Sequence, residues 1–272
     1  MKSMFKGYIG YTDEEFESLW SNAKFVIDTN IILNFFKYTS KESYINFFMI
    51  LEKLKKQNRL FIPHQVALEY FFNYRENMEK QELAINSLAE KLSATKDIVE
   101  KHFLKVKNEH PYIEEDVFQF YLDALQQANS ELEIKRELLI KNLPDMEIVH
   151  KRILILLDGV TGIPYIQQKL DEIQQQGKFR YEQMIPPGFK DKLDKNNSIR
   201  TYGEISYNQQ FGDLILWNQL MDFSLENKVP LIFVTEDNKE DWWYKKRGQV
   251  VGPHPNLIQK FYEKTNLNFY MY

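Results

Sequence analysis

The sequence predicts an α/β fold in which a central parallel sheet is flanked by helices in three layers, with one helical insertion. Short, β-branched apolar runs at residues 25–28, 60–62 and 230–235 have the length and composition of buried strands. Each run is followed by residues with helical periodicity, and this alternation is typical of parallel sheets covered on both faces. The alternation is interrupted once, between residues 76 and 210.

The first strand places an acid at the edge of the predicted sheet. Thr12 and Glu15 have the spacing of a capping box, which predicts a short helix before this strand. A longer apolar run at residues 31–36 predicts the start of a helix after it. Asp28 therefore lies at the carboxyl end of a buried strand, where open α/β sheets bind their ligands. A poorly solvated carboxylate there favours a cation, although Asp28 would also serve as a simple helix cap.

A second acid follows the second strand. Pro63 suits the first turn of a helix, because that position needs no backbone donor. Glu69 lies on this predicted helix among mostly apolar residues. An acid in such surroundings is costly unless it is paired or metal-bound, so the alternatives are a metal ligand and a salt bridge to Arg75.

The interruption predicts a separate helical region. From residue 76 to about 142, two apolar stripes with helical period predict an antiparallel helical hairpin. We therefore expect residues 1–75 and 211–272 to form the core, and residues 76–210 to form a mainly helical insertion.

The end of the insertion contains a proline-rich segment. A helix predicted to end at Gly177 is followed by basic and aromatic residues, and residues 185–192 contain adjacent prolines and a glycine that exclude regular structure. Next to an acidic site this segment would bind phosphates; it would equally serve as the return from the insertion. The phosphate-binding candidates are Lys178, Arg180, Lys190 and Lys192.

Two more acids come from the last part of the chain. Asp213 lies in the first turn of a buried helix predicted to end at residues 227–228. The strand at 230–235 then delivers Asp237 to the same sheet edge as Asp28. A helix is expected over residues 238–247, and a strand, a helix and a terminal strand complete the chain.

Composition sets limits on function. The 272 residues contain no Cys, which excludes disulfides, thiolate metal sites and a cysteine nucleophile. The net charge of −4 neither indicates nor excludes nucleic-acid binding. There is no bilayer-spanning apolar run and no signal-peptide pattern, so we expect a soluble, cytoplasmic protein without membrane contact.

The convergence of carboxylates indicates the chemistry. Asp28, Glu69, Asp213 and Asp237 are hard oxygen ligands without His or Cys, a set that suits Mg²⁺ or Mn²⁺. Without a cation they would repel and raise one another's pKa. With one or two metal ions they would orient and deprotonate a water and stabilise the leaving oxygen of a phosphodiester. The chemistry implied is hydrolysis of a nucleic-acid backbone.

Longer sequence strings add a family resemblance. The strings at residues 26–30, 62–69, 185–191, 212–217 and 235–243 resemble those of PIN-like nucleases, in the bacterial branch with a large helical insertion. This resemblance covers most of the chain. It implies a parallel sheet with an acidic, metal-dependent nuclease site.

The resemblance assigns roles to individual residues. It implies that the four acids above bind metal and are catalytic, and that Asp241 is an additional acid. Asn30 and Thr235 would support them. It also implies a toxic activity in defence against phage.

Several functions remain open from the sequence. The first is a metal-dependent endonuclease, with RNA slightly favoured over DNA as the substrate. The second is a PIN-like binding or sensor module that works with a partner protein; the insertion would bind a regulatory protein or a second copy of the chain. The third is a phosphatase with Asp28 as nucleophile. That chemistry commonly uses a second Asp two residues later, where this chain has Asn30.

Overall fold

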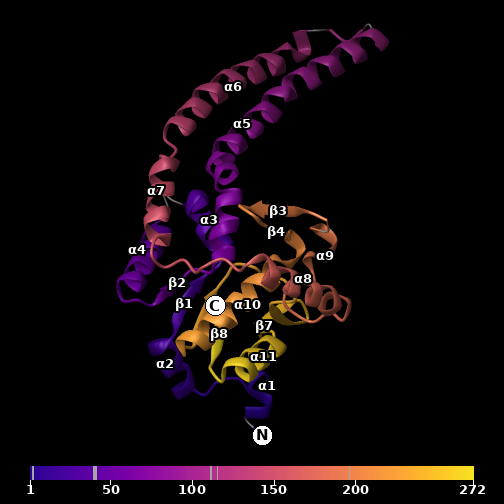
Figure 1. Cartoon of the computed structure of the whole chain (residues 1–272). Helices are drawn as coiled ribbons and strands as arrows, with labels where there is room; N and C mark the ends of the chain where they lie inside the picture. The colour runs from indigo at the N-terminus through magenta and orange to yellow at the C-terminus, as the bar shows by residue number, and fades with distance from the viewer. Residues whose placement is uncertain (2, 39–41, 111, 115, 196) are drawn as a thin grey trace. The chain divides into compact units, whose positions relative to one another are not determined.

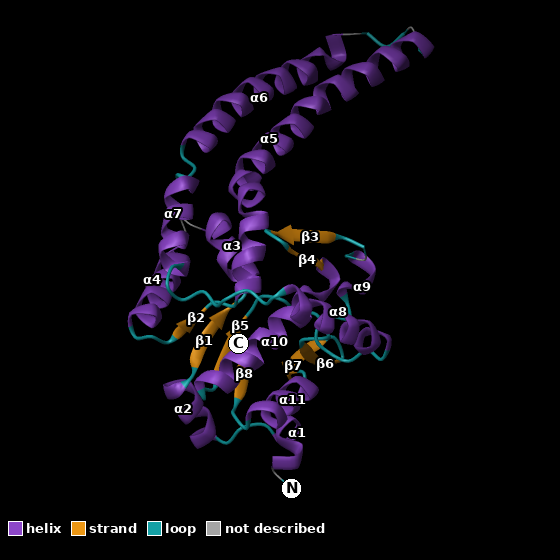
Figure 2. Ribbon diagram, viewed as in Figure 1, coloured by secondary structure: helices purple, strands orange, loops and turns teal. Residues whose placement is uncertain are grey.

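The computed structural model describes residues 1, 3–38, 42–110, 112–114, 116–195 and 197–272. The chain divides into two compact units, one formed by Met1–Tyr74 with Ile148–Tyr272 and the other by Arg75–Glu147. Figure 1 and Figure 2 show the main sheet and its surrounding helices in the first unit.

The first unit contains the sheet and most of the helices. Its strands are β1 (Lys24–Ile27), β2 (Leu60–Phe61), β3 (Ile199–Tyr202), β4 (Ile205–Asn208), β5 (Leu231–Val234), β6 (Trp243–Lys246), β7 (Gln249–Pro253) and β8 (Phe269–Met271). Its longer helices are α2 (Asp13–Asn22), α3 (Thr29–Tyr38), α4 (Glu42–Lys56), most of α7 (Met146–Leu157), α8 (Gln167–Glu182), α10 (Gly212–Asn227) and α11 (Pro255–Thr265). Short turns of helix are η1 (Ser3–Phe5), α1 (Lys6–Ile9), α9 (Asp191–Asp194) and η2 (Gln209–Phe211). The first turns of α5 (His64–Glu109) complete it.

The main sheet is parallel, with strand order β2-β1-β5-β8. Phe25 of β1 is in register with Ile232 of β5, so both side chains lie on one face. Leu19 and Ala23 cover that face, which makes α2 one outer layer.

The opposite face of the sheet is covered by aromatic side chains. Val26 is in register with Phe233, whose ring centroid lies 5.3 Å from that of Trp242. Trp217 of α10 lies against Trp242 and against Phe269 of β8, with centroids 6.2 and 5.2 Å apart. Helices on both faces of a parallel sheet confirm the predicted α/β fold.

Local sequence explains where the early elements begin and end. Thr12 and Glu15 form the predicted capping box at the start of α2. Helix α5 begins at His64, directly after Pro63, as expected for a proline at a helix start. Asp28 is the single residue between β1 and α3, so the strand-to-helix junction that we expected is present.

Helix α8 continues beyond its predicted end. Gly177 does not end the helix, which runs to Glu182. A Cβ atom at Gly177 would lie 2.6 Å from the Phe211 ring, so the glycine allows this ring to pack directly against the helix. The expectation of a helix end at Gly177 was wrong because close packing, and not a turn, requires the glycine.

The helix expected over residues 238–247 is also absent from the described structure. The chain forms the antiparallel hairpin β6–β7 there, with Lys246 opposite Gln249. Arg247 and Gly248, the two residues of the turn, both have positive φ, at 53° and 78°. This is the backbone of a two-residue hairpin turn. The basic residues 245–247, which suggested the end of a helix, therefore lie at the end of a strand and in a turn.

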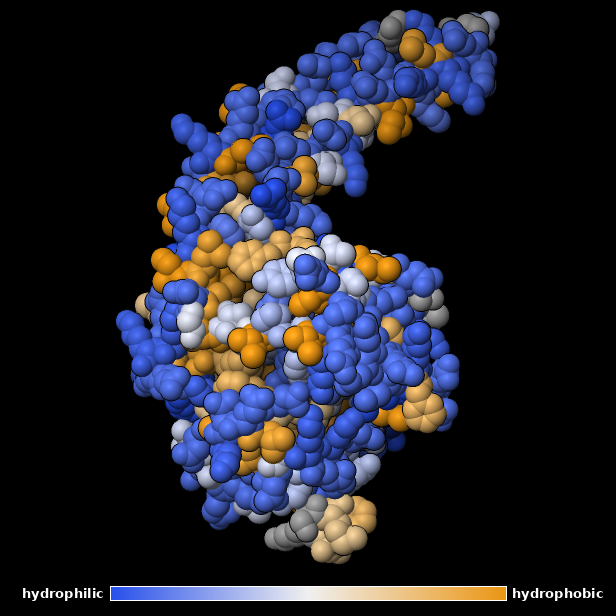
Figure 3. Space-filling model, viewed as in Figure 1, coloured by the Kyte–Doolittle hydropathy of each residue, from blue (hydrophilic) through white to orange (hydrophobic). Residues whose placement is uncertain are grey.

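The second unit is a helical hairpin made by the rest of α5 and by α6 (Asp116–Lys141). The rings of Phe103 and Phe118 lie 4.8 Å apart, and Asn129 donates a hydrogen bond to the Ser93 carbonyl at 3.3 Å. These pairs run in opposite directions along the two helices, as in an antiparallel hairpin. Figure 3 shows a mostly hydrophilic surface on its visible face, with scattered apolar residues.

The compact units and the expected domains have different boundaries. Residues 148–210 are grouped with the sheet, and not with the helical hairpin. The division into a core of residues 1–75 and 211–272 and an insertion of residues 76–210 stays a prediction. None of the helices in the described ranges has the length and apolar character needed to cross a bilayer.

Candidate functional site

Asp28 lies at the carboxyl end of β1, as the sequence predicts. Its Oδ1 accepts a hydrogen bond from the Thr29 backbone at 2.7 Å, and its Oδ2 accepts hydrogen bonds from Thr235 at 2.6 Å and Asn30 at 3.0 Å. The carboxyl group is withdrawn from solvent, and this burial raises its pKa to about 6, against the lowering effect of the Thr235 hydroxyl.

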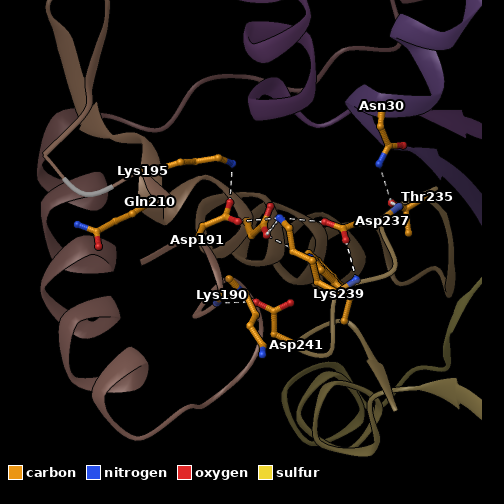
Figure 4. A network of polar contacts seen from close by, with 12 residues as sticks. Asn30, Lys190, Asp191, Lys195, Gln210, Thr235, Asp237, Lys239 and Asp241 are labelled. Carbon is orange, nitrogen blue, oxygen red and sulfur yellow. Dashed lines mark hydrogen bonds and ion pairs between the residues drawn. The ribbon is translucent and has the colours of Figure 1, made fainter. Parts of the chain in front are cut away.

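Thr235 connects two of the predicted acids. While it donates to Asp28, its Oγ1 accepts hydrogen bonds from Asn30 Nδ2 at 3.1 Å and from the Asp237 backbone at 3.0 Å. Asn30 Oδ1 in turn accepts from the Glu236 backbone at 3.2 Å. Figure 4 shows Asn30 reaching Thr235 from the neighbouring segment. Both residues expected to support the site thus tie the end of β1 to the end of β5.

Glu69 faces this junction from α5. Its Oε2 lies 3.4 Å from the Thr29 hydroxyl, and its Oε1 accepts a hydrogen bond from Gln65 one turn earlier at 2.8 Å. Gln65 also donates to the Tyr207 hydroxyl at 3.0 Å, so its amide is held from two sides. A Cβ atom at position 212 would lie 2.8 Å from Glu69 Oε1, and Gly212 therefore lets α10 begin beside this carboxylate.

Asp213 lies in the first turn of α10. Its Oδ2 accepts a hydrogen bond from the Trp242 indole at 3.2 Å and lies 3.8 Å from the Lys239 ammonium. Burial raises the pKa of Asp213 to about 8, although the positive charge of Lys239 acts in the opposite direction. The negative charge of Glu69 raises the pKa of both Asp28 and Asp213. The three carboxylates therefore lie within electrostatic reach of one another.

Asp237 belongs to a network that the sequence analysis missed. Its Oδ2 lies 3.1 Å from the Lys239 ammonium, which also contacts Asp191 Oδ1 at 2.7 Å. The second oxygen of Asp191 pairs with Lys195 at 2.5 Å. Figure 4 shows this chain of alternating charges running from Lys195 to Asp237. Burial favours the neutral form of Asp191, but the hydrogen bonds and charges of Lys195 and Lys239 lower its pKa below the usual value.

Asp241 is fully buried and faces the proline-rich loop. Its Oδ2 accepts hydrogen bonds from the backbone of Gly188 and of Lys190, both at 3.0 Å. Burial raises its pKa, against the effect of the Lys190 backbone donor and the Lys239 charge. Asp241 therefore fixes the loop, and the metal-binding role expected for it stays a prediction.

The basic candidates are arranged in two ways. Lys178 and Lys192 are exposed and line an open groove of about 690 Å³, together with amide side chains such as Gln174 and the acids Asp171 and Glu182. Arg180 is half-buried, and its guanidinium donates to the Pro186 carbonyl. Lys190 is exposed and pairs with Glu240 at 2.7 Å. No ion pair of the described residues involves Lys178 or Lys192, whereas Arg180 holds the loop in place.

The donor set has the chemistry of a Mg²⁺ or Mn²⁺ site. Carboxylate oxygens are the ligands that these hard cations prefer. Asp28 has no ion pair with any residue that the structure describes, whereas Asp213 lies 3.8 Å from the Lys239 ammonium. Among the described residues, however, no three His, Asp or Glu side chains form a ready-made group that could hold a metal ion. The residues fit the cation by type, and Lys239 already neutralises part of the cluster.

A comparison with models of known protein families shows which family the chain belongs to. A family model described as a PIN-like domain matches residues 24–257, which is most of the chain. The chain belongs to the PIN-like domain family. Members of this family are typically nucleases that bind Mg²⁺ or Mn²⁺. Searches of curated proteins and of solved structures with this chain gave no match.

Lys239 and Asp191 had only weak signals in the sequence. Asp191 closes the string at residues 185–191, and Lys239 follows Asp237 by two positions. Either would pass as an ordinary surface charge. Their roles depend on a contact between the proline-rich loop and the turn after β5, which no local pattern predicts.

Proposed function

We propose that this PIN-like domain is a metal-dependent endonuclease that hydrolyses phosphodiester bonds of nucleic acids, with RNA slightly favoured over DNA. The observation that carries the proposal is the pair of buried acids, Asp28 and Asp213, at one edge of the sheet. Burial raises their pKa to about 6 and about 8, so the folded chain bears a cost whenever both are ionised. A divalent cation would relieve that cost.

The residues that would hold the cation are Asp28, Glu69, Asp213 and Asp237. Mg²⁺ or Mn²⁺ supplies a polarised water for attack on phosphorus and positive charge for the leaving oxygen. Thr235 and Asn30 hold the Asp28 carboxylate in one orientation through hydrogen bonds of 2.6 and 3.0 Å. Gln65 does the same for Glu69. Side chains held in this way are preorganised for a ligand.

The groove containing Lys178 and Lys192 supports a path for the substrate strand. Exposed ammonium groups neutralise phosphates without reading sequence, which is how proteins commonly position a nucleic-acid backbone. Lys190 is a third candidate. It could replace its ion pair with Glu240 by one with a phosphate, so its charge would stay paired. The family resemblance favours a toxic effector in phage defence as the biological setting.

A second candidate function is a binding or sensor module that works with a partner protein. The contacts of Lys239 with Asp191, Asp213 and Asp237 favour it, because a cluster neutralised from within needs fewer cations. Such a module would bind nucleic acid without cleaving it.

The test of the endonuclease is metal-dependent cleavage. The purified protein is incubated with labelled single- and double-stranded RNA and DNA in Mn²⁺, Mg²⁺ or EDTA. We expect Asp28→Asn and Asp213→Asn each to lower the cleavage rate by about 100-fold or more, because each removes charge from the metal ligands.

The matched control is Asp222→Asn. Asp222 accepts hydrogen bonds from Tyr165 and Lys264, both at 2.6 Å, and it lies outside the acid cluster. This variant should cleave at the wild-type rate. Nucleic-acid binding without cleavage in any metal would favour the binding module, and equal cleavage by all four proteins would point to a contaminating nuclease.

A further inference from the structure

The ammonium group of Lys239 lies inside the acid cluster. Its Nζ is 2.7 Å from Asp191 Oδ1, 3.1 Å from Asp237 Oδ2 and 3.8 Å from Asp213 Oδ2. These carboxylates come from three separate segments of the chain, and Figure 4 shows Asp191 and Asp237 on either side of the lysine. Several carboxylates around one positive charge are the surroundings that a divalent cation takes in other acidic sites.

These contacts differ from ordinary surface ion pairs. The Lys239 side chain is only 34% exposed, and those of Asp191, Asp213 and Asp237 are 5%, 20% and 17% exposed. An exposed pair contributes little to stability and is readily exchanged. Removing this cation would leave the poorly solvated Asp213 and Asp237 carboxylates without their ion pair, whereas Asp191 would keep Lys195. Lys239 is therefore a fixed part of the cluster.

The other end of the cluster has no such cation. In the part of the chain that the structure describes, no ion pair involves Asp28 or Glu69, and both accept hydrogen bonds only from neutral donors. Lys195 lies within electrostatic reach of Glu69, but its ion pair is with Asp191. Glu69 nevertheless lies within electrostatic reach of Asp28 and of Asp213. The cluster thus has one half in which carboxylates contact a lysine ammonium and one half in which they do not.

We propose that Lys239 occupies one of two cation positions in this cluster, so that the site takes a single divalent ion, bound beside Asp28 and Glu69. This inference rests on the proposed function, because it concerns the metal ion of the same site. Lys239 is then a positioning residue. It holds Asp213 and Asp237 by charge, as a second metal ion would, without bringing a bound water.

The test counts bound ions and does not depend on cleavage. Mn²⁺ is titrated into the full-length protein, and the free ion is followed by its electron paramagnetic resonance signal. We expect one Mn²⁺ per chain for the wild type and two for Lys239→Met, which removes the charge and leaves an unbranched side chain one atom shorter. The control is Lys264→Met, which breaks a 2.6 Å pair with Asp222 at the same 34% exposure of the lysine. It should bind one Mn²⁺.

The wild-type count keeps the inference falsifiable even when a variant does not fold. Two ions on the wild type would overturn it, as would one ion on a folded Lys239→Met protein or two ions on Lys264→Met. No ion on the wild type would overturn the single-ion site and would also contradict the metal-dependent nuclease, even if Lys239→Met bound one ion. A wild type that binds two ions and cleaves nucleic acid would support the metal-dependent nuclease and overturn the inference about Lys239.

Discussion

At the scale of single residues, the site is defined by acids kept from water. Asp28 and Asp213 were predictable because each has a local signal: a position after a buried strand and a position in the first turn of a buried helix. Their partners were less predictable. Thr235 is adjacent to its strand, but Lys239 meets Asp191 only after the whole first unit has folded. Sequence patterns therefore predicted the positions of the acids better than those of the groups that neutralise them.

The raised pKa values of Asp28 and Asp213 predict how stability depends on pH without metal. A carboxyl in the unfolded chain has a pKa of about 3.9. Since the folded values are about 6 and about 8, the folded protein binds more protons than the unfolded chain in this range. The contribution of these two carboxyl groups to the free energy of unfolding is then fully present below pH ~4. It is lost as the pH rises through their folded pKa values. In EDTA, the urea midpoint should be lower at pH 8 than at pH 5.

The variant Asp213→Asn tests the same assignment. At pH 8 in EDTA it should raise the free energy of unfolding by about 1–3 kcal/mol, because a neutral amide replaces a buried charge. At pH 5 the gain should be much smaller. Asp222→Asn should be destabilising instead: burial favours the neutral acid, but the hydrogen bonds from Lys264 and Tyr165 lower the pKa of Asp222. A gain for Asp213→Asn that does not vary with pH would contradict the assignment.

At the scale of elements, periodic segments were predicted well and turns were not. The strands around Val26 and Phe233 and the helix after Pro63 follow from apolar pattern and capping. The first strand of the hairpin, at residues 243–246, was mistaken for the end of a helix, since Trp242 gains its burial and its hydrogen bond from distant residues such as Asp213. The Arg247-Gly248 pair was the available signal for the turn.

The loop at residues 185–192 depends on Asp241. Asp241→Ala should lower the free energy of unfolding by about 2–4 kcal/mol, because it leaves the backbone donors of Gly188 and Lys190 without their acceptor. Asp241→Asn keeps an acceptor oxygen and should cost less. Urea unfolding measures both. If Asp241→Asn instead removed bound Mn²⁺ at unchanged stability, Asp241 would be a metal ligand.

Gly188 gives the same loop its close approach to the site. It has a φ of +90°, and a Cβ atom there would lie 2.3 Å from the Tyr181 hydroxyl and 3.0 Å from Asp213 Cβ. Gly188→Ala should therefore lower stability and displace Asp213, reducing Mn²⁺ affinity. Gly248→Ala is the matched control, because Gly248 has a φ of +78° with open space around it. It should cost only about 1 kcal/mol of backbone strain and leave Mn²⁺ binding unchanged.

At the scale of the whole molecule, the helical hairpin leaves and rejoins the first unit at neighbouring points. The Tyr74 and His150 rings stack with centroids 4.3 Å apart, and the Tyr70 hydroxyl lies 2.6 Å from His150 Nδ1. Contacts within the first unit therefore join the segment before the hairpin to the segment after it. Local periodicity predicted the hairpin but could not show that residues 148–210 pack with the sheet.

This closure predicts that the hairpin is dispensable for folding. Replacing residues 75–147 by a short Gly-Ser linker between Tyr74 and Ile148 should give a protein with a cooperative thermal transition and the wild-type Mn²⁺ count. Circular dichroism and the Mn²⁺ titration measure the two properties. Retained folding with lost cleavage would assign the hairpin to substrate or partner binding. An unfolded product would show that the hairpin stabilises the sheet.

The pairing of Asn30 with Thr235 joins positions 205 residues apart in the chain. A ribosome therefore completes one half of the acid cluster long before it begins the other. Polypeptides released early by a stop codon or a stalled message would contain Asp28 and Glu69 but lack Asp213 and Asp237. Under the proposed function, only chains translated past Asp237 would carry all four acids, so fragments from translation errors would lack a complete site.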